Sequence, residues 1–571
     1  MATSSEDNMR SRTQQSPLAS QRARSSHPSE ATRNQPRGYF PLGYKEGFSQ
    51  WWQGMSPAVT EHTVLSYIPH LQKPPTHTQT GSAPPSASVS TMSVDKDPSR
   101  EAAPITTSSL TDPYGPRRWH SNLVKLSGKN RFLNEFSVER VEEDVENNLV
   151  MLHGYGAGLG FFYKNFEALS RAPGWKLYAL DMLGMGRSSR PTFKILAKDR
   201  EAKITEAENW FIDALEEWRV KKGIDRFTLL GHSLGGYMAV AYALKYPGHL
   251  NKLILASPVG IPEDPYAVNA DMPEPEDSTM ANEFTQDQGS VINESNPDIP
   301  ANPKSGDNNN FLNARKNAGK QEGSGTPPRK PLPKWLTYLW DANISPFSLV
   351  RWTGPLGPRL VSGWTSRRFS HLPPDEAQAL HDYSYSLFRQ RGSGEYALAY
   401  ILAPGAFARS PLIRRIQGVG RQYLGLHTAP TPDTNTNSNA TPETALTTQS
   451  SPSSPSPATA QQQQQQQQQG KRENGIPVVL MYGEHDWMDI AGGYAAEQKM
   501  NEEKEKALRN ASAQEARADR GSAKVVVIKK AGHHVYLDND RHFNEVMLEE
   551  MKETQQAERR RRAELEGGSA K

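Results

Sequence analysis

Three residues of this sequence have the side chains that acyl transfer requires, and each lies one to three residues after a glycine. Ser233 is the serine of a G-x-S-x-G pattern at 231–235, Asp486 lies three residues after Gly483, and His533 follows Gly532. A serine hydroxyl attacks a carbonyl carbon when an imidazole removes its proton, and a carboxylate holds that imidazole in the required tautomer. We therefore expect Ser233 as nucleophile, His533 as base and Asp486 as acid.

The segments on either side of Ser233 predict a strand, a tight turn and a helix. Residues 227–230 are apolar and predict a short buried strand, whereas residues 236–245 are rich in Ala and Tyr and predict a helix. A tight strand-to-helix turn forces its corner residue into strained backbone angles, and flanking glycines prevent collisions there. Ser233 would then lie at the N-terminus of a helix, where the macrodipole favours developing negative charge.

The acid and the base each follow a predicted strand. The strand at 476–482 leads into Asp486 and Asp489, and the strand at 525–528 leads into His533. The chain order serine, acid, histidine is the order expected when a serine on a strand-to-helix turn is nucleophilic. Asp486 has the usual offset from the end of its strand, and Asp489 is the alternative acid.

An oxyanion hole needs two backbone N–H donors near the nucleophile. Leu234, which follows Ser233, supplies one of them. The glycine-rich loop at 153–160 follows the predicted strand 148–152, and Tyr155 in this loop is our candidate for the second donor. Its glycines would let the loop approach the substrate closely.

Strands and helices alternate over most of the ordered sequence, which predicts an α/β fold with a mostly parallel, doubly wound sheet. A capping box at 205–208 predicts the start of an amphipathic helix. The alternation stops after residue 265 and resumes at 476. The aromatic, helix-forming middle of this insertion predicts a cap over the active site.

We divide the chain into nine segments. They are a disordered start (1–38), an aromatic amphipathic segment (39–71), a disordered segment (72–115), the N-terminal portion of the catalytic core (119–265), a disordered insertion (266–330), a helical cap (331–423), a low-complexity polyglutamine linker (424–474), the C-terminal portion of the core (476–555) and a charged tail (556–571).

Composition excludes several classes of function. The 571 residues contain no cysteine, which excludes disulfides, cysteine-containing zinc sites and a cysteine nucleophile. The net charge of +3 gives no reason to expect nucleic acid as a partner. No apolar run is long enough to span a bilayer, so any membrane contact would be peripheral. We expect neither a metal nor a cofactor.

These motifs together resemble the α/β-hydrolase fold. The resemblance rests on the turn at 231–235, the His153-Gly154 loop, D-x-x-G-x-G-x-S at 181–188 and the late Gly-His pair, and it covers 119–265 and 476–552. The cap segments 344–351, 363–369 and 391–395 resemble a lipid-acting subfamily related to N-acyl-phosphatidylethanolamine lipase. Its fungal branch includes cardiolipin-specific deacylases and proteins described as lysophosphatidic acid acyltransferases.

The resemblance implies three alternative functions. The first is a serine hydrolase that cleaves acyl esters of phospholipids, including cardiolipin, with water or a lysolipid as acceptor. The second is a lysophosphatidic acid acyltransferase that uses the H-x4-D motif of His533 and Asp538. Asp538 could instead cap the helix that starts near Asp540. The third is a non-catalytic adaptor on a lipid surface, as in relatives that lack the serine.

Further expectations concern the substrate surface and the compartment. The cap arginines at 367, 368, 389 and 391 (Arg367, Arg368, Arg389 and Arg391) are candidate phosphate ligands because guanidinium groups donate in pairs. The aromatic segment around Trp51 and Trp52 either lies at a membrane or lipid-droplet surface, as in the family it resembles, or packs on the catalytic domain. The cardiolipin branch implies the mitochondrion, with cytoplasm or lipid droplet as the alternative.

Overall fold

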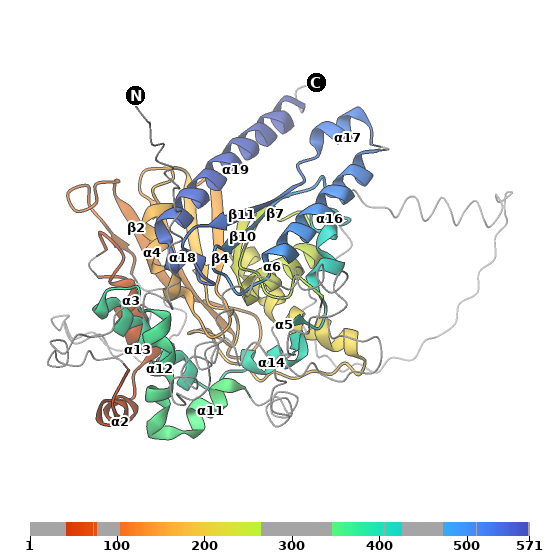
Figure 1. Ribbon diagram of the computed structural model, residues 1–571. Helices are drawn as coiled ribbons and strands as arrows, with labels where there is room; N and C mark the ends of the chain where they lie inside the picture. Colours follow the sequence, from red (N-terminus) through yellow and green to blue (C-terminus); the bar gives the residue numbers. More distant parts are fainter. Residues whose placement is uncertain are drawn as a thin grey trace, which may run out of the picture.

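The computed structural model describes residues 41–71, 73–76, 103–263, 345–403, 407–424, 472–509 and 511–568 (Figure 1). The expected disordered start at 1–38 and the insertion at 266–330 lie outside the described residues. So do most of 72–115, the polyglutamine stretch and residues 331–344 of the expected cap.

A nine-stranded sheet forms the centre of the described structure, in the order β1-β2-β3-β5-β4-β6-β7-β10-β11. The strands are β1 (Ile105–Thr106), β2 (Arg117–Lys125), β3 (Phe132–Arg140), β4 (Asn147–Leu152), β5 (Trp175–Leu180), β6 (Phe227–His232), β7 (Leu250–Ala256), β10 (Pro477–Gly483) and β11 (Ser522–Ile528). The six neighbouring strands β5, β4, β6, β7, β10 and β11 pair in parallel. The pairs β1–β2, β2–β3 and β3–β5 are antiparallel. This confirms the predicted α/β class with its mostly parallel sheet.

The central strands bury side chains on both faces. In β4, Leu149 and Met151 belong to one apolar cluster, and Val150 and Leu152 belong to the other. Successive strand residues point to opposite faces, so an apolar run of this kind requires helices on both sides. The first cluster includes residues of α4 (Tyr163–Leu169), α18 (Val535–Asp538) and α19 (Asp540–Gly568), and the second includes residues of α5 (Arg200–Lys221), α6 (Leu234–Lys245) and α16 (Ile490–Arg509).

The remaining helices gather beside the core, at the lower end of Figure 1. From the N-terminal segment come α2 (Tyr44–Gln53) and α3 (Pro57–Leu65). From the cap come α11 (Pro346–Trp352), the short helix η3 (Gly354–Leu356), α12 (Gly357–Arg368), α13 (Pro374–Arg389) and α14 (Gly394–Ile401). Helix α3 packs against α13, and α2 packs against η3 and α12, so the aromatic segment and the cap form one layer.

The smaller elements complete the described chain. They are the short helices η2 (Leu159–Phe162), η4 (Leu412–Arg414), η5 (Ile416–Gly418) and α17 (Ala513–Ala518), and the two-stranded ribbon of β8 (Leu402–Ala403) and β9 (Phe407–Ala408). Beyond η5, the chain on either side of 425–471 is paired, because Tyr423 bridges Arg472 and Gly475 N–H donates to Gly420 O at 2.8 Å.

Two helix boundaries differ from the sequence expectation. Helix α5 begins at Arg200 rather than at the capping box of 205–208, because the Asp199 carboxylate already accepts the first-turn N–H of Ala202 at 2.9 Å. Helix α19 extends to Gly568, so most of the expected charged tail is helical. Its Glu558 side chain is buried and contacts Arg226 and Arg520, which holds the extension against the domain.

Residues 103–115, which we expected to be unstructured, are held to the sheet by a buried ion pair. Arg117 on β2 is fully buried, and its Nε lies 2.6 Å from Asp112 Oδ2. Thr107 Oγ1 donates to the same oxygen at 3.0 Å, and Tyr114 N–H donates to Asp112 Oδ1 at 3.1 Å. Composition did not reveal this anchor because it depends on a partner in a neighbouring strand.

We predict that Asp112→Ala lowers the free energy of unfolding by about 1–3 kcal/mol, because the buried Arg117 guanidinium loses its nearer carboxylate and keeps only that of Glu167, whose Oε1 lies at 3.2 Å. The matched control is Glu146→Ala, which removes the exposed ion pair with Arg559 at 2.7 Å and costs about 0–1 kcal/mol. Urea titrations of both variants measure the difference. Equal midpoints for the two would contradict this account of the segment.

Candidate active site

Ser233 occupies the sharp turn between β6 and α6. Its backbone has φ 52° and ψ −115°, a combination that costs a non-glycine residue free energy. Its N–H donates to Ala256 O at 3.0 Å, which ties the turn to β7. A Cβ at Gly235 would lie 2.7 Å from the carbonyl oxygens of Leu152 and His153, and a Cβ at Gly231 would overlap the Gly235 carbonyl. The two glycines are therefore steric requirements of this turn.

His533 and Asp486 meet where β10 and β11 end. His533 Nδ1 lies 3.2 Å from Asp486 Oδ1, and both side chains are almost fully buried. Backbone bonds fix the two loops against each other, since His485 N–H donates to Ala531 O at 2.9 Å. This contact assigns the proton to Nδ1 and leaves Nε2 as the basic nitrogen of the imidazole.

Asp486 is held as a carboxylate by several donors. Ser257 Oγ donates to Oδ2, and Met488 N–H donates to Oδ1 at 3.0 Å. Burial alone would raise the pKa of Asp486, but the contacts with His533, Ser257 and Met488 outweigh it and lower that pKa below its usual range. The carboxylate is therefore charged at neutral pH and can stabilise a protonated His533.

Asp489, the alternative acid, is bonded to the first turn of α16. Its Oδ1 accepts the N–H of Ala491 at 3.0 Å, in the first turn of α16, and burial raises its pKa. It is thus a cap for α16. The structure joins Asp486 to the imidazole of His533, as the sequence favoured.

His232 brings the Ser233 turn and the His533 loop together. Its Nε2 donates to the carbonyl of His533 at 3.0 Å, and the two imidazole rings are 4.8 Å apart. Burial and the neighbouring His533 lower the pKa of His232 well below its usual range, so it stays neutral. The sequence analysis missed this role, because the partner of His232 lies 301 residues further along the chain.

The loop at 153–160 packs against Ser233. A Cβ at Gly154 would lie 3.1 Å from Ser233 Cβ, so only a glycine fits between the loop and the turn. His153 orders the start of the loop, because its Nε2 accepts Met182 N–H at 3.1 Å and its Nδ1 donates to Gly154 O at 2.7 Å. Leu234 begins helix α6, so the two proposed oxyanion donors, at Leu234 and Tyr155, belong to segments that meet at Ser233.

The Tyr155 side chain faces the cap. Its ring stacks on Phe347 of α11 with centroids 4.7 Å apart, and its hydroxyl lies 3.3 Å from Ser345 Oγ. Ser233 itself is only 8% exposed. The cap therefore contacts the loop that packs against Ser233.

Asp538 of the H-x4-D motif is bonded to the backbone of the loop that carries His533. Its Oδ2 accepts Gly532 N–H at 2.9 Å and lies 3.5 Å from Arg368 Nη2. The suggestion that Asp538 caps the next helix is wrong, because Asn539 Oδ1 accepts the first-turn N–H of His542 at 3.2 Å. His534 is buried and contacts Arg368.

The four candidate phosphate ligands do not converge. Arg368 lies beside Gly532 and Asp538, as described, while Arg389 lies close to Gly54 at the end of α2. Arg391 is exposed, and Arg367 is half-buried on α12. The arrangement of the described residues does not form one phosphate site from these four side chains.

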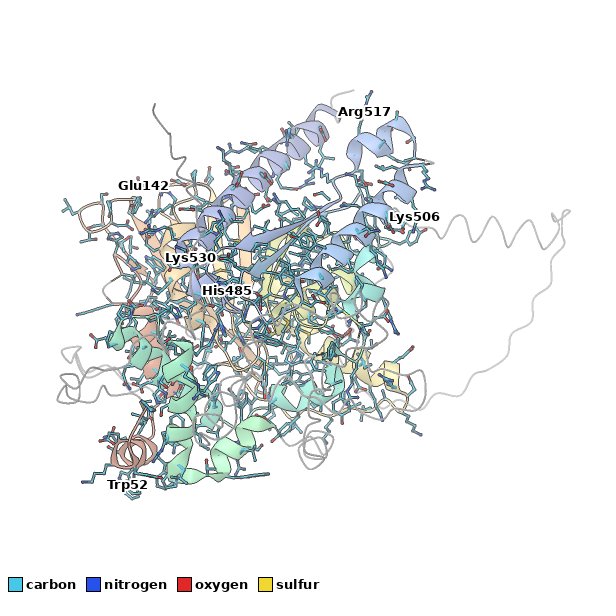
Figure 2. All side chains as sticks on the ribbon, in the orientation of Figure 1. Trp52, Glu142, His485, Lys506, Arg517 and Lys530 are labelled. Carbon is cyan, nitrogen blue, oxygen red and sulfur yellow. The ribbon has the colours of Figure 1, made fainter. Side chains whose placement is uncertain are left out.

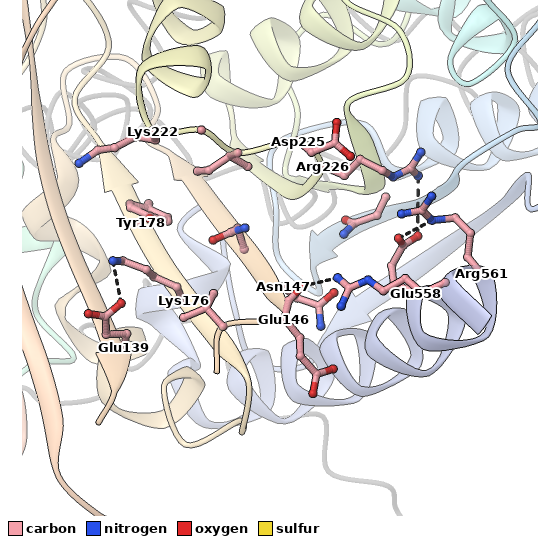
Figure 3. A pocket seen from close by; sticks show the side chains of 16 residues that line it. Glu139, Glu146, Asn147, Lys176, Tyr178, Lys222, Asp225, Arg226, Glu558 and Arg561 are labelled. Atoms are coloured by element: carbon pink, nitrogen blue, oxygen red, sulfur yellow. Dashed lines mark hydrogen bonds and ion pairs between the residues drawn. The ribbon is translucent and has the colours of Figure 1, made fainter. Parts of the chain in front are cut away.

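A cleft in the described portion of the chain lies at the opposite end of the parallel strands (Figure 3). It has a volume of about 360 Å³ and is lined by residues at the amino ends of the parallel strands and by α19. Its charges are paired within the protein, as in Lys176 with Glu139 at 2.7 Å and Arg561 with Glu558 at 2.8 Å. It is remote from Ser233, which follows the carboxyl end of β6.

Comparison with known proteins agrees with this geometry. The profile of the family described as alpha/beta hydrolase fold matches residues 147–540. The 1-acylglycerol-3-phosphate O-acyltransferase of Arabidopsis thaliana is 34% identical over 53% of this chain and 58% of its own length. The 1-acylglycerol-3-phosphate O-acyltransferase ABHD5 of Mus musculus is 31% identical over 53% of this chain and 68% of its own length.

A further relative carries a lipase name. The (lyso)-N-acylphosphatidylethanolamine lipase of Bos taurus is 30% identical over 47% of this chain and 60% of its own length. The chain thus spans less than two thirds of the plant and bovine relatives. The names of all three relatives refer to acyl lipids.

We predict that Gly231→Ala destabilises the fold by about 2 kcal/mol or more, because the added methyl group would overlap backbone rather than a movable side chain. The control is Gly363→Ala on α12, where an added Cβ meets no atom within 4 Å and should stabilise the helix by about 0.5–1 kcal/mol. Thermal denaturation of both variants distinguishes them. A Gly231→Ala variant as stable as the native protein would contradict the packing described for the turn.

Proposed function

This chain belongs to the alpha/beta hydrolase fold family, and on that premise we propose that it is a serine hydrolase that cleaves acyl esters of phospholipids. The observation that carries the proposal is the contact of His533 Nδ1 with Asp486 at 3.2 Å, next to a serine in a strained strand-to-helix turn. A buried histidine–aspartate pair and a strained serine each cost free energy, and acyl transfer uses both.

In the proposed reaction, Ser233 Oγ attacks the acyl carbonyl carbon while His533 Nε2 takes the hydroxyl proton. Asp486 keeps the other proton on Nδ1 and stabilises the imidazolium. The N–H groups of Leu234 and Tyr155 stabilise the oxyanion. His533 then protonates the departing lysolipid oxygen, which leaves an acyl-serine and a free alcohol. Water, deprotonated by the same imidazole, releases the fatty acid and restores Ser233.

The proposed substrate class is phospholipid or lysophospholipid. The names of the relatives, which refer to 1-acylglycerol-3-phosphate and to N-acylphosphatidylethanolamine, support acyl lipids as substrates. Within this class, the cap motifs resemble the branch of cardiolipin-specific deacylases, and we propose deacylation of cardiolipin as the specific reaction.

A second candidate function is acyl transfer to lysophosphatidic acid, which the acyltransferase names of the relatives favour. In the structure, Asp538 accepts from Gly532 N–H and lies near Arg368, while the His533 imidazole contacts Asp486. This arrangement favours transfer from the same acyl-serine, with the lysolipid hydroxyl in place of water. The third alternative, a non-catalytic adaptor, leaves the strained Ser233 without a use.

An exposed apolar face supports attachment to a lipid surface. On α2, the Trp52 side chain is 74% exposed and points away from the body of the protein (Figure 2), and Phe48 stacks on it at 6.3 Å. We call this surface the lipid-facing patch, and its exposed members are Tyr44, Phe48, Trp52, Trp352, Leu356 and Leu360. They lie on α2, α11, η3 and α12, and Leu42 N–H, which donates to Ser362 Oγ at 3.0 Å, fixes α2 to α12.

The lipid-facing patch fits peripheral attachment. Aromatic and aliphatic side chains gain free energy when they enter the boundary between head groups and acyl chains. Among the helices within the described ranges, none is both long and apolar enough to cross a bilayer. We propose a membrane of the mitochondrion as the surface, with a lipid droplet or a cytoplasmic pool as alternatives that cell fractionation decides.

We predict that Asp486→Asn lowers phospholipid deacylation by about 10³- to 10⁴-fold, because the imidazole loses the group that fixes its tautomer. Ser233→Ala should abolish deacylation and labelling by a fluorophosphonate probe. Asp489→Asn, the matched control, should keep its rate and its stability, because asparagine caps a helix about as well as aspartate does. A variant pattern in which Asp489→Asn is inactive and Asp486→Asn is active would reverse the assignment.

Product analysis separates hydrolysis from transfer. Purified protein is incubated with a labelled phospholipid, with and without lysophosphatidic acid, and fatty acid and phosphatidic acid are quantified. Transfer that persists in Ser233→Ala would support the H-x4-D mechanism. Unaltered cardiolipin in cells that carry Ser233→Ala would remove cardiolipin as the substrate.

We predict that Trp52→Ser and Trp352→Ser each weaken binding to phosphatidylcholine–phosphatidylglycerol vesicles by about tenfold, because each removes a large apolar side chain from the patch. Leu110→Ser is the control, since Leu110 is as exposed as any apolar residue described but lies outside the patch. Vesicle sedimentation measures all three. Equal binding by the three variants would contradict the location of the surface.

A further inference from the structure

Glu61 on α3 is a buried carboxyl group that none of the proposed chemical steps uses. It is 1% exposed, although the helix that carries it belongs to the aromatic segment at the surface. Its Oε1 accepts from Arg187 Nη1 at 2.5 Å, and its Oε2 accepts from Asn134 Nδ2 at 3.0 Å and from Tyr383 OH at 3.4 Å. These partners come from the core sheet, from the loop after β5 and from cap helix α13.

The partners of Glu61 hold the loop at 153–160. Tyr383 OH accepts Gly160 N–H at 3.3 Å and donates to Glu61. Asn134 Nδ2 also donates to Asp181 Oδ2 at 2.8 Å, and Asp181 Oδ1 accepts Leu159 N–H at 2.7 Å. The Gly160 amide is therefore linked to Glu61 through one side chain, that of Tyr383. The Leu159 amide is linked to Glu61 through two, those of Asp181 and Asn134.

Stability alone does not explain a carboxyl group at this place. Burial raises the pKa of Glu61 to about 7, with Arg187 opposing the change and Asp181 adding to it. A carboxyl whose pKa rises on folding makes the folded state less stable as pH increases above its ordinary pKa, and the cost is complete above about pH 7. The charged groups that face Glu61 are Arg187 and Asp181. Arg187 therefore has two carboxylates near it, those of Glu61 and Asp181.

The same segment is also fixed to the cap through buried polar contacts. Gln50 Nε2 donates to Asp382 Oδ1 at 2.7 Å, and Thr60 Oγ1 lies 2.8 Å from Ser386 Oγ. Both partners lie on α13, the helix that carries Tyr383. The aromatic segment (39–71), helix α13 of the cap and the 153–160 loop thus form one hydrogen-bonded unit with Glu61 at its centre.

We propose that Glu61 is a positioning residue. Through it the aromatic segment (39–71) holds the 153–160 loop, and with it the Tyr155 N–H, in the arrangement that stabilises the oxyanion. This rests on the proposed serine hydrolase function. The oxyanion contact strengthens in the transition state, so its misplacement lowers kcat and leaves substrate binding almost unchanged.

The test compares Glu61→Gln with Glu46→Gln, a control on the exposed side of the same segment. With p-nitrophenyl butyrate, a soluble ester that needs no lipid surface, Glu61→Gln should lower kcat by about tenfold with KM changed by less than about twofold. Its Tm at pH 8 should change little, because the amide loses the ion pair with Arg187 but also removes a buried carboxylate that is costly at that pH. Glu46→Gln should match the native protein in all three quantities.

Hydrogen exchange of the 153–163 peptide gives a readout that does not require activity. Glu61→Gln should speed exchange at Leu159 and Gly160 by about fivefold or more, with peptides of β6 and β7 unchanged. Tyr383→Phe, which removes the hydroxyl between Gly160 and Glu61, should change exchange in the same direction.

Three outcomes decide the inference. A fall in kcat together with faster loop exchange supports it. A lower Tm with kcat and exchange unaltered overturns it and makes Glu61 a structural residue. If the native protein hydrolyses no ester and reacts with no serine probe, the proposed function fails, and unchanged exchange in Glu61→Gln would then also overturn the coupling.

Discussion

The backbone of Ser233 is the constraint on which the other features of the site depend. A serine with φ 52° costs about 1–3 kcal/mol in an unconstrained chain. It persists here because its N–H is bonded to β7 and because Gly235 packs directly under the end of β4. The parallel sheet brings the ends of β10 and β11 to the same edge, and this places Asp486 and His533 beside a turn that lies far away in the sequence.

Much of this site could be predicted from the sequence because its logic is local. A serine between glycines, an acid after one strand and a histidine after the next need only the end of each strand to be recognised, and the contact between His533 and Asp486 lies where that pattern predicts it. The parallel core could be predicted for the same reason, since apolar runs that alternate with amphipathic helices admit few other folds.

The features that could not be predicted depend on contacts that composition and periodicity do not show. Asp112 looked like one residue of a polar linker, but it neutralises a buried arginine of β2. Nothing in the sequence of the aromatic segment singled out Glu61, yet it lies at the meeting point of sheet, cap and loop. The cap arginines shared a residue type but not a location. Composition and periodicity describe a segment by itself, and these residues are defined by what lies opposite them.

The pairing of Tyr423 with Arg472 has a consequence for how this sequence can change over generations. The described residues that border the stretch 425–471 on its two sides meet in one backbone pairing. Closing a flexible loop costs only about 0.6 kcal/mol more for each doubling of its length. With both ends held by this pairing, a change in the number of glutamines at 461–469 should therefore alter the stability of the folded domain by less than about 1 kcal/mol.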